Sequence, residues 1–160
     1  MANFVVPKEQ DVKQILGMLF SDLEIAPSTA ALATADADKT LMAVFIDDDD
    51  APVAYCACDH AFAAYAGASL TMIPKGVAEE AAANGDFSKP VLDNVSEIMN
   101  ICSRLFMNNR TPHLRLDRTY PSPGEVPAEQ KCDAGSMAAR SDYEVTIPNY
   151  GQGRIAFLSS

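Results

Sequence analysis

No run of apolar residues in this chain approaches the roughly 20 that an α-helix needs to cross a bilayer. The first ten residues, MANFVVPKEQ, also lack the basic start and long apolar stretch of a secretory signal peptide. A cytoplasmic location is therefore expected. In that compartment the four cysteines, Cys56, Cys58, Cys102 and Cys132, are expected to be free thiols.

Positive charge is scarce in this sequence. Twelve Lys and Arg residues face 22 Asp and Glu residues, which gives a formal net charge of -10 and a pI near 4.5. This balance repels nucleic-acid phosphates and anionic lipid, so neither nucleic acid nor a membrane surface is an expected partner. The net charge also offers no long-range steering toward another acidic protein.

The length and composition are those of one ordinary globular domain. The chain has 160 residues, of which 48% are hydrophobic and 21% are charged. A chain of this size can bury a proper hydrophobic core. We expect residues 1–160 to form a single domain.

Hydrophobic spacing and turn residues predict several helices and short strands. Helices are expected at residues 8–23, 61–70, 75–84 and 89–107, and strands at residues 41–46, 53–58, 113–120, 142–147 and 154–158. Turn residues at 47–52 and 148–153 predict two β-hairpins. The segment between residues 121 and 141, rich in Pro, Gly and Ala, is expected to be a loop with one helical turn.

The order of the predicted elements repeats. A helix followed by strands occurs twice, and the two helices begin about 80 residues apart. This hints at an ancient duplication. The pattern predicts an α+β fold, in which a mainly antiparallel sheet is covered by two long helices.

Two clusters admit a metal-binding interpretation, but a structural one is favoured for each. The four aspartates at 47–50 lack a regular liganding spacing and a glycine bend, so a solvated turn is preferred. Cys56, Cys58 and His60 alternate along a strand, whereas structural zinc takes four ligands from paired turns. Buried thiols are the preferred interpretation of these cysteines, and no metal site of this chain is expected.

The helix expected at residues 89–107 has two contrasting faces. Apolar side chains form one broad stripe, as in any helix packed on a core. On the opposite side Asp93, Glu97, Asn100 and Arg104 follow one another at helical spacing, so they share a narrow strip. Taken alone, such a strip is typical of a solvated helix surface.

A match to a known motif changes this interpretation. With Pro123, the residues Asp93, Glu97 and Asn100 resemble the pattern D/S-x3-E-x2-N-x22-P of the CheC/CheX/FliY phosphatases of bacterial chemotaxis. From average residue usage, all four positions would agree by chance in roughly 0.3% of chains this long. In its short length and single site the chain resembles CheX most.

The resemblance implies an enzyme that hydrolyses the aspartyl phosphate of a CheY-like response regulator. Asn100 would orient the attacking water, and Glu97 would pair with a lysine of the regulator. Asp93 would be a secondary contact or a first-turn anion that suits the helix dipole. Pro123 would shape the loop beside the helix. The regulator would bring the metal ion, so this chain would need no cofactor of its own. A homodimer is also implied.

Two residues depart from the family pattern, which favours small side chains around the asparagine. Met99 can turn toward the core, but Arg104 shares the strip with Asn100. Its guanidinium could block insertion of the helix or contact the acidic pocket of the regulator. This leaves an alternative function open: a non-catalytic module of the same fold that docks a regulator or a motor-switch component.

The first predicted helix serves as an internal comparison. If the two halves are related, Asp11, Ile15 and Met18 occupy the places of Asp93, Glu97 and Asn100. Isoleucine and methionine can neither orient water nor pair with lysine. The chain is therefore expected to carry a single site.

Overall fold

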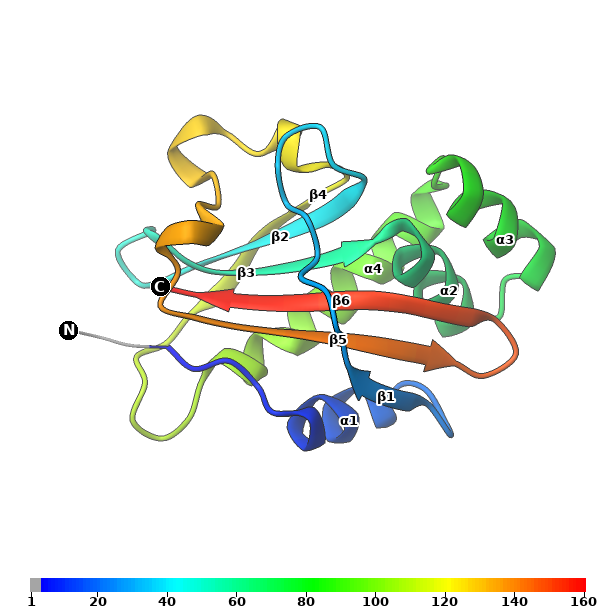
Figure 1. The fold of residues 1–160 in the computed structure, drawn as a ribbon, viewed down its shortest axis with the longest axis horizontal. Coiled ribbons are helices and arrows are strands. Elements are labelled where there is room, and N and C mark those ends of the chain that lie inside the picture. Colours follow the sequence, from blue (N-terminus) through cyan, green and yellow to red (C-terminus); the bar gives the residue numbers. More distant parts are fainter. Residues whose placement is uncertain (1–3) are drawn as a thin grey trace.

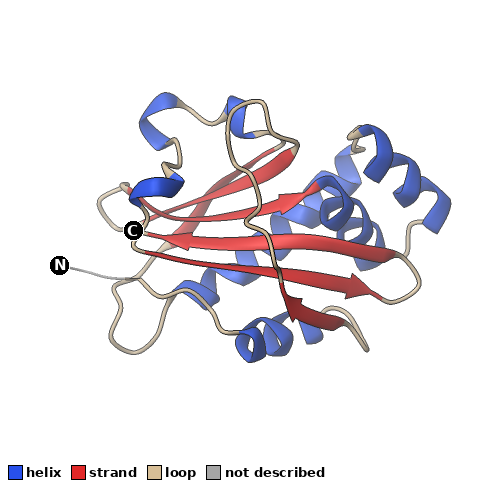
Figure 2. Cartoon of the chain, in the orientation of Figure 1, coloured by secondary structure: helices blue, strands red, loops and turns tan. Residues whose placement is uncertain are grey.

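One six-stranded sheet organises the computed structural model, which describes residues 4–160 (Figures 1 and 2). The helices are α1 (Glu9–Gly17), α2 (His60–Leu70), α3 (Lys75–Asn84) and α4 (Lys89–Cys102). The strands are β1 (Glu24–Pro27), β2 (Thr40–Ile46), β3 (Pro52–Asp59), β4 (Arg115–Tyr120), β5 (Ala139–Ile147) and β6 (Gly151–Ser159). Short 3-10 turns are η1 (Ser103–Phe106), η2 (Pro123–Glu125), η3 (Ala128–Gln130) and η4 (Ala134–Ser136).

The strand order reflects the repeated pattern of the sequence. It is β1-β5-β6-β3-β2-β4, and each pair of neighbours is antiparallel. When the unit α1-β1-β2-β3 is exchanged with the unit α4-β4-β5-β6, the same strand order results, read from the opposite edge of the sheet. The predicted α+β fold with an antiparallel sheet and two related halves is confirmed.

The sheet has a hydrophobic core on each face. Helices α1, α2 and α4 cover one face, while the long loops before β2 and before β5 cross the other (Figure 1). Strand β2 lies between β3 and the edge strand β4, and all seven of its residues are buried. Leu41, Ala43 and Phe45 belong to the helix-side core, whereas Met42 and Val44 belong to the loop-side core. The continuous apolar run of this strand follows from burial on both faces.

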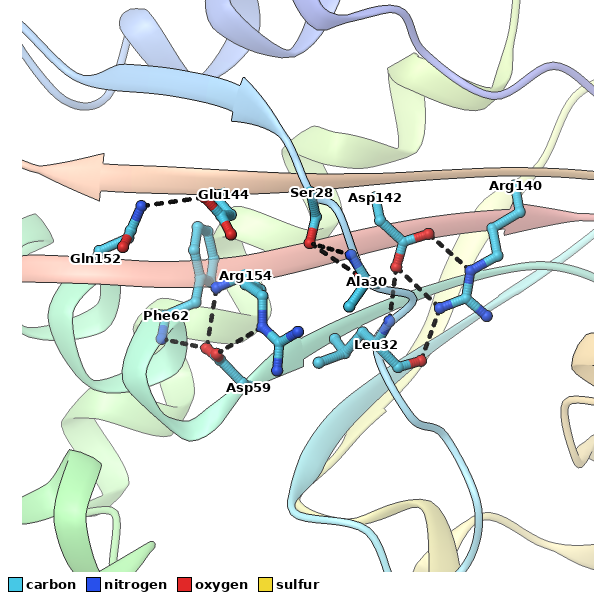
Figure 3. A network of polar contacts seen from close by, with 10 residues as sticks. All are labelled: Ser28, Ala30, Leu32, Asp59, Phe62, Arg140, Asp142, Glu144, Gln152 and Arg154. Carbon is cyan, nitrogen blue, oxygen red and sulfur yellow. Dashed lines mark hydrogen bonds and ion pairs between the residues drawn. The ribbon is translucent and has the colours of Figure 1, made fainter.

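Polar contacts tie the covering segments to the sheet (Figure 3). Asp142 of β5 forms an ion pair with Arg140 at 2.7 Å, and its carboxylate also accepts a hydrogen bond from the backbone N–H of Leu32. The guanidinium of Arg140 donates to the carbonyl of Leu32. These contacts hold the loop between β1 and β2 against the sheet.

Both predicted hairpins are confirmed, but the extents of two predicted helices are wrong. The helix expected at residues 8–23 ends at Gly17, and β1, an edge strand, follows after a turn in which Asp22 has a φ of 59°. The helix expected at residues 89–107 ends as an α-helix at Cys102 and continues as the 3-10 turn η1. The segment expected to be loop contains three 3-10 turns, and β5 begins at Ala139.

His60 begins α2 and packs its ring edge-on against Phe87, with 5.3 Å between ring centroids. Burial lowers the pKa of this imidazole, the nearby Lys39 lowers it further, and Asp59 opposes both effects. The folded protein therefore binds a proton at His60 less readily than the unfolded chain does.

We expect the free energy of unfolding to fall as the pH drops through about 6.5, because the unfolded chain then takes up a proton that the folded state resists. His60→Gln should flatten this dependence in urea unfolding measured between pH 5 and 8. The matched variant His113→Gln changes the other, exposed histidine and should leave the dependence in place. An equal effect of both substitutions would contradict this role of His60.

Candidate functional site

Helix α4 carries the predicted site residues, and its local sequence explains its position. Ser88 occupies the N-cap position with an extended backbone, and Pro90 lies in the first turn, where proline is tolerated. One face is buried against the core through Val91, Val95, Ile98, Met99 and Cys102. The predicted inward turn of Met99 is confirmed, because its side chain is fully buried.

The opposite face of α4 presents Asp93, Glu97 and Asn100 to solvent. Asp93 forms an exposed ion pair with Lys89 one turn earlier, at 2.8 Å. Within residues 4–160, no side-chain hydrogen bond or ion pair engages Glu97 or Asn100. An acid and an amide thus stand one turn apart, unengaged by the rest of the described chain.

A groove of about 330 Å³ runs between α4 and the edge strand β4, and we call it the α4–β4 groove. Its lining comprises Leu92, Asp93, Ser96, Asn100, Leu116, Asp117, Arg118, Thr119 and Pro121. The pairing of β4 with β2 shifts register at Asp117, which leaves an extra residue in β4. Such bulges bend a strand and redirect its side chains. Thr119 belongs to the wall of the groove, but in the described chain its hydroxyl is buried and has no hydrogen-bond partner.

Pro123 lies away from this groove. It begins η2, is buried, and its carbonyl accepts a hydrogen bond from the Lys131 ammonium at 2.8 Å. Pro121, two residues earlier, lines the α4–β4 groove instead. The structure therefore brings Asp93 and Asn100 together with Pro121 and not with Pro123.

Arg104 leaves the strip that the sequence pattern assigned to it. The α-helix ends at Cys102, where the Ser103 hydroxyl donates to the carbonyl of Asn100 at 2.7 Å and the chain tightens into η1. Arg104 then lines a second groove, between α1 and η1, which we call the α1–η1 groove. Arg104 does not line the groove of Asn100, so the groove itself gives no support to the alternative in which its guanidinium blocks the helix.

The corresponding face of α1 lacks the acid–amide pair. Asp11 is exposed, and its carboxylate accepts a hydrogen bond from the backbone N–H of Lys8 at 3.1 Å, so it caps α1. Ile15 is half-buried, and Met18 is 66% exposed just beyond the helix end. At the positions that correspond to Glu97 and Asn100, α1 therefore presents apolar side chains.

Asn94 is a residue of α4 that the sequence interpretation missed. Its side-chain amide donates to the carbonyl of Gly67 at 2.8 Å and to the hydroxyl of Thr71 at 2.9 Å, so it joins α4 to the end of α2. Gly67 lies close enough to Val91 and Val95 that an added Cβ would approach them to 2.9 and 3.1 Å. The amide bonds and this close packing fix the rotation of α4, and hence the direction of its exposed face.

Replacing Asn94 with alanine should lower the free energy of unfolding by about 1–2 kcal/mol, because two hydrogen bonds are lost and a helix-end carbonyl is left without its partner. Urea unfolding should show a lower midpoint with an unchanged slope. Thr71→Val removes only one of the two bonds, and its effect should be smaller. A larger effect of Thr71→Val would contradict this assignment.

The cysteines are free thiols, and burial keeps the three of them in the core unreactive. Burial raises the pKa of the Cys102 thiol to about 12 and raises the pKa values of Cys56 and Cys58 well above the ordinary range. The thiolate is the reactive form, so these side chains are poor nucleophiles. The prediction that Cys56 and Cys58 are buried thiols is confirmed.

The four aspartates at residues 47–50 lie in the turn between β2 and β3. The Asp47 carboxylate accepts hydrogen bonds from the backbone N–H groups of Asp49 and Ala51, at 2.9 and 3.0 Å. Across residues 4–160, no three His, Cys, Asp or Glu side chains gather in a way that could hold a metal ion. The same part of the chain contains no helix long and apolar enough to span a membrane.

Comparison with known proteins identifies the fold. No protein-family model matches this sequence, and no curated protein gives a significant match. Among solved structures, the FliM–SpeE complex from H. pylori matches with 15% identity and a TM-score of 0.59, covering 94% of this chain and 78% of that chain. The FliM middle domain from H. pylori matches with 14% identity and a TM-score of 0.53, covering 94% and 82%.

A further match is the CheX–CheY–BeF3–Mg2+ complex from Borrelia burgdorferi, with 10% identity and a TM-score of 0.50. It covers 91% of this chain and 90% of that chain. The chain therefore has the fold of the CheC/CheX/FliY family, and the FliM middle domain has a similar fold. This confirms at the level of fold the resemblance first indicated by Asp93, Glu97 and Asn100.

Proposed function

We propose that this protein is a phosphatase that hydrolyses the aspartyl phosphate of a CheY-like response regulator. The observation that carries the proposal is the pair Glu97 and Asn100. Both side chains are exposed one turn apart on α4, and nothing else in residues 4–160 engages them by a hydrogen bond or ion pair. The spacing of Asp93, Glu97 and Asn100 matches the motif of a family whose fold this chain has.

The reaction requires this chain to position a water molecule, and it does not require a nucleophile from this chain. Water attacks the phosphorus, the bond to the aspartyl oxygen breaks, and inorganic phosphate and a free carboxylate result. The transition state is loose, so catalysis depends mainly on alignment and on stabilisation of charge. When bound, the metal ion of the regulator neutralises charge on the phosphoryl oxygens.

Asn100 would hold the attacking water in line with the bond that breaks. A carboxamide suits this task because it both donates and accepts hydrogen bonds and does not titrate. Asn100 lies on the wall of the α4–β4 groove, so a partner can approach its side chain.

Glu97 would pair with a lysine of the regulator and fix the register of α4 in its active site. Asp93 is already paired with Lys89, so its charge is partly compensated before a partner arrives. This fits the lesser role of a secondary contact or of an anion that favours the first turns of the helix. The residue beside the groove that could shape a loop contact is Pro121 rather than Pro123.

The test is single-turnover loss of phosphate from purified, phosphorylated CheY-like receiver domains of the source organism. Native protein should accelerate the loss from at least one receiver by tenfold or more. A series in which no receiver loses phosphate faster than its spontaneous rate would reject the phosphatase function.

A second candidate is a non-catalytic module that docks a regulator or a motor-switch component. One observation favours it: the FliM structures match with TM-scores of 0.59 and 0.53, above the 0.50 of the CheX complex. The same experiment separates the candidates, because a docking module would bind a phosphorylated receiver and leave its rate of phosphate loss unchanged.

We also propose that the protein is a cytoplasmic homodimer. Both properties are implied by the resemblance to the family. Sedimentation equilibrium of the native chain should then give about twice its mass of 17.1 kDa. A mass that stays at 17.1 kDa over the accessible concentration range would remove the dimer and leave the site on α4 untouched.

A further inference from the structure

The α1–η1 groove is formed in part by η1, which directly continues α4, and has a volume of about 490 Å³, within the range of ligand pockets. Its apolar lining includes Val6, Ile15, Leu105 and Met107, and Lys8 and Arg104 add positive charge. An apolar hollow beside positive side chains suits a partner segment in which an apolar residue neighbours an acid.

The walls of this groove are held in place by contacts within the chain. The backbone N–H of Val5 donates to the carbonyl of Phe106 in η1 at 3.0 Å. The buried hydroxyl of Tyr143 donates to the carbonyl of Pro7 at 2.7 Å. The N-terminal segment is therefore fixed between η1 and β5, and the groove is formed before any partner binds.

The apolar character of the groove arises where the two halves of the chain differ. Ile15, at the place that corresponds to Glu97, lines the groove directly. Met18, at the place of Asn100, is 66% exposed on the same helix end. The half that lacks the acid–amide pair thus offers an apolar surface beside the half that has it.

The charges of the lining favour an acidic partner. Asp11 also lines the groove, but its carboxylate caps α1 through the backbone N–H of Lys8. Within residues 4–160, Arg104 takes part in no ion pair. Lys8 and Arg104 outnumber the one lining acid, Asp11, so the lining is net positive on a protein whose net charge is -10.

The groove is also within reach of a partner bound at α4. Arg104 follows Asn100 by four residues, a rise of about 6–8 Å along the axis. A regulator with its phosphoaspartate over Asn100 would bring the acidic rim of its own active site toward the guanidinium of Arg104.

We propose that the α1–η1 groove is a second docking site for the regulator bound at α4, and that it receives an apolar side chain next to an acidic one. This inference rests on the proposed function. It gives Arg104 the role of a partner-binding residue outside the reacting centre, and it explains how an acidic protein can attract an acidic partner through one local surface.

The experiment measures the affinity of this protein for a receiver domain that is saturated with beryllofluoride and Mg2+. The receiver is the one that loses phosphate faster in the single-turnover assay. Arg104→Glu reverses the charge at the groove, and Gln14→Trp places a bulky ring from the exposed α1 residue that lines it. Each should weaken binding about tenfold, and raised salt should reduce the effect of Arg104→Glu. Arg110→Glu and Gln10→Trp make the same changes at exposed residues outside the groove and should alter binding less than twofold.

The outcomes separate this inference from the proposed function. If native protein binds no activated receiver, both are rejected. If Arg104→Glu and Gln14→Trp bind as tightly as their controls while native protein still accelerates phosphate loss, only the groove is rejected as a docking site. If the two substitutions weaken self-association of the chain and leave receiver binding intact, a second copy occupies the groove, and the inference is likewise overturned.

Discussion

Asn100→Ala is expected to return phosphate loss to within about twofold of its spontaneous rate, since the water would lose the group that aligns it with the breaking bond. The variant should fold normally, because the Asn100 side chain is exposed and makes no hydrogen bond within residues 4–160. Single-turnover assays with a saturating concentration of this protein measure the chemical step and keep it apart from binding.

Two further variants sharpen this test. Asn100→Asp preserves the shape of the side chain but removes a donor and adds negative charge near the phosphoryl group, so it should be as slow as alanine or slower. Asn109→Ala replaces another exposed asparagine, beyond the end of η1, and should retain native rates. If Asn100→Ala accelerated phosphate loss as well as native protein does, Asn100 would have no part in catalysis.

The parts of the fold that could be predicted are those in which the spacing of apolar residues along the chain matches the residues that are buried. The buried face of α4 and the β2–β3 hairpin both follow from spacing of apolar residues. Strand β1 was not predicted, because only Ile25 among its four residues is even partly buried. Its pairing with β5, more than 100 residues away, forms this edge strand, and such a contact leaves no local pattern.

The site shows the same limit. The spacing of Glu97 and Asn100 identified a helix face that the structure indeed exposes. The spacing could not tell that the helix tightens after Cys102 and turns Arg104 toward α1, because a hydroxyl–carbonyl contact at Ser103 accompanies that change. Nor could it tell that Pro121 would lie beside the helix, since the bulge at Asp117 and the loop after β4 determine this.

The glycines after β5 have a role that their residue type does not reveal. They were predicted to form the turn of the last hairpin. The turn itself is Pro148–Tyr150, with Asn149 at a φ of 71°, and Gly151 and Gly153 belong to β6. Gly153 lies directly beneath the first turn of α2, where an added Cβ would come within 2.3 Å of the backbone nitrogen of Phe62.

Gly153→Ala should therefore destabilise the protein by about 3 kcal/mol, because the new methyl group meets backbone atoms that no rotamer change can move aside. The carboxylate of Asp59 joins the same two elements by accepting from the backbone N–H groups of Phe62 and Arg154, at 2.8 and 3.1 Å. Displacing α2 from β6 would stretch these hydrogen bonds as well. Urea unfolding at neutral pH should show a much lower midpoint.

Gly76→Ala provides the matched control, since an added Cβ in α3 meets nothing within 4 Å. There alanine should be neutral or stabilise the helix by up to about 1 kcal/mol. Asn94 joins α2 to α4, so a displaced α2 would also disturb α4. Any acceleration of phosphate loss that native protein shows should therefore fall most for Gly153→Ala under conditions that begin to unfold the protein. A midpoint for Gly153→Ala equal to that of native protein would mean that α2 and β6 separate at little cost, and the close contact would then have no structural importance.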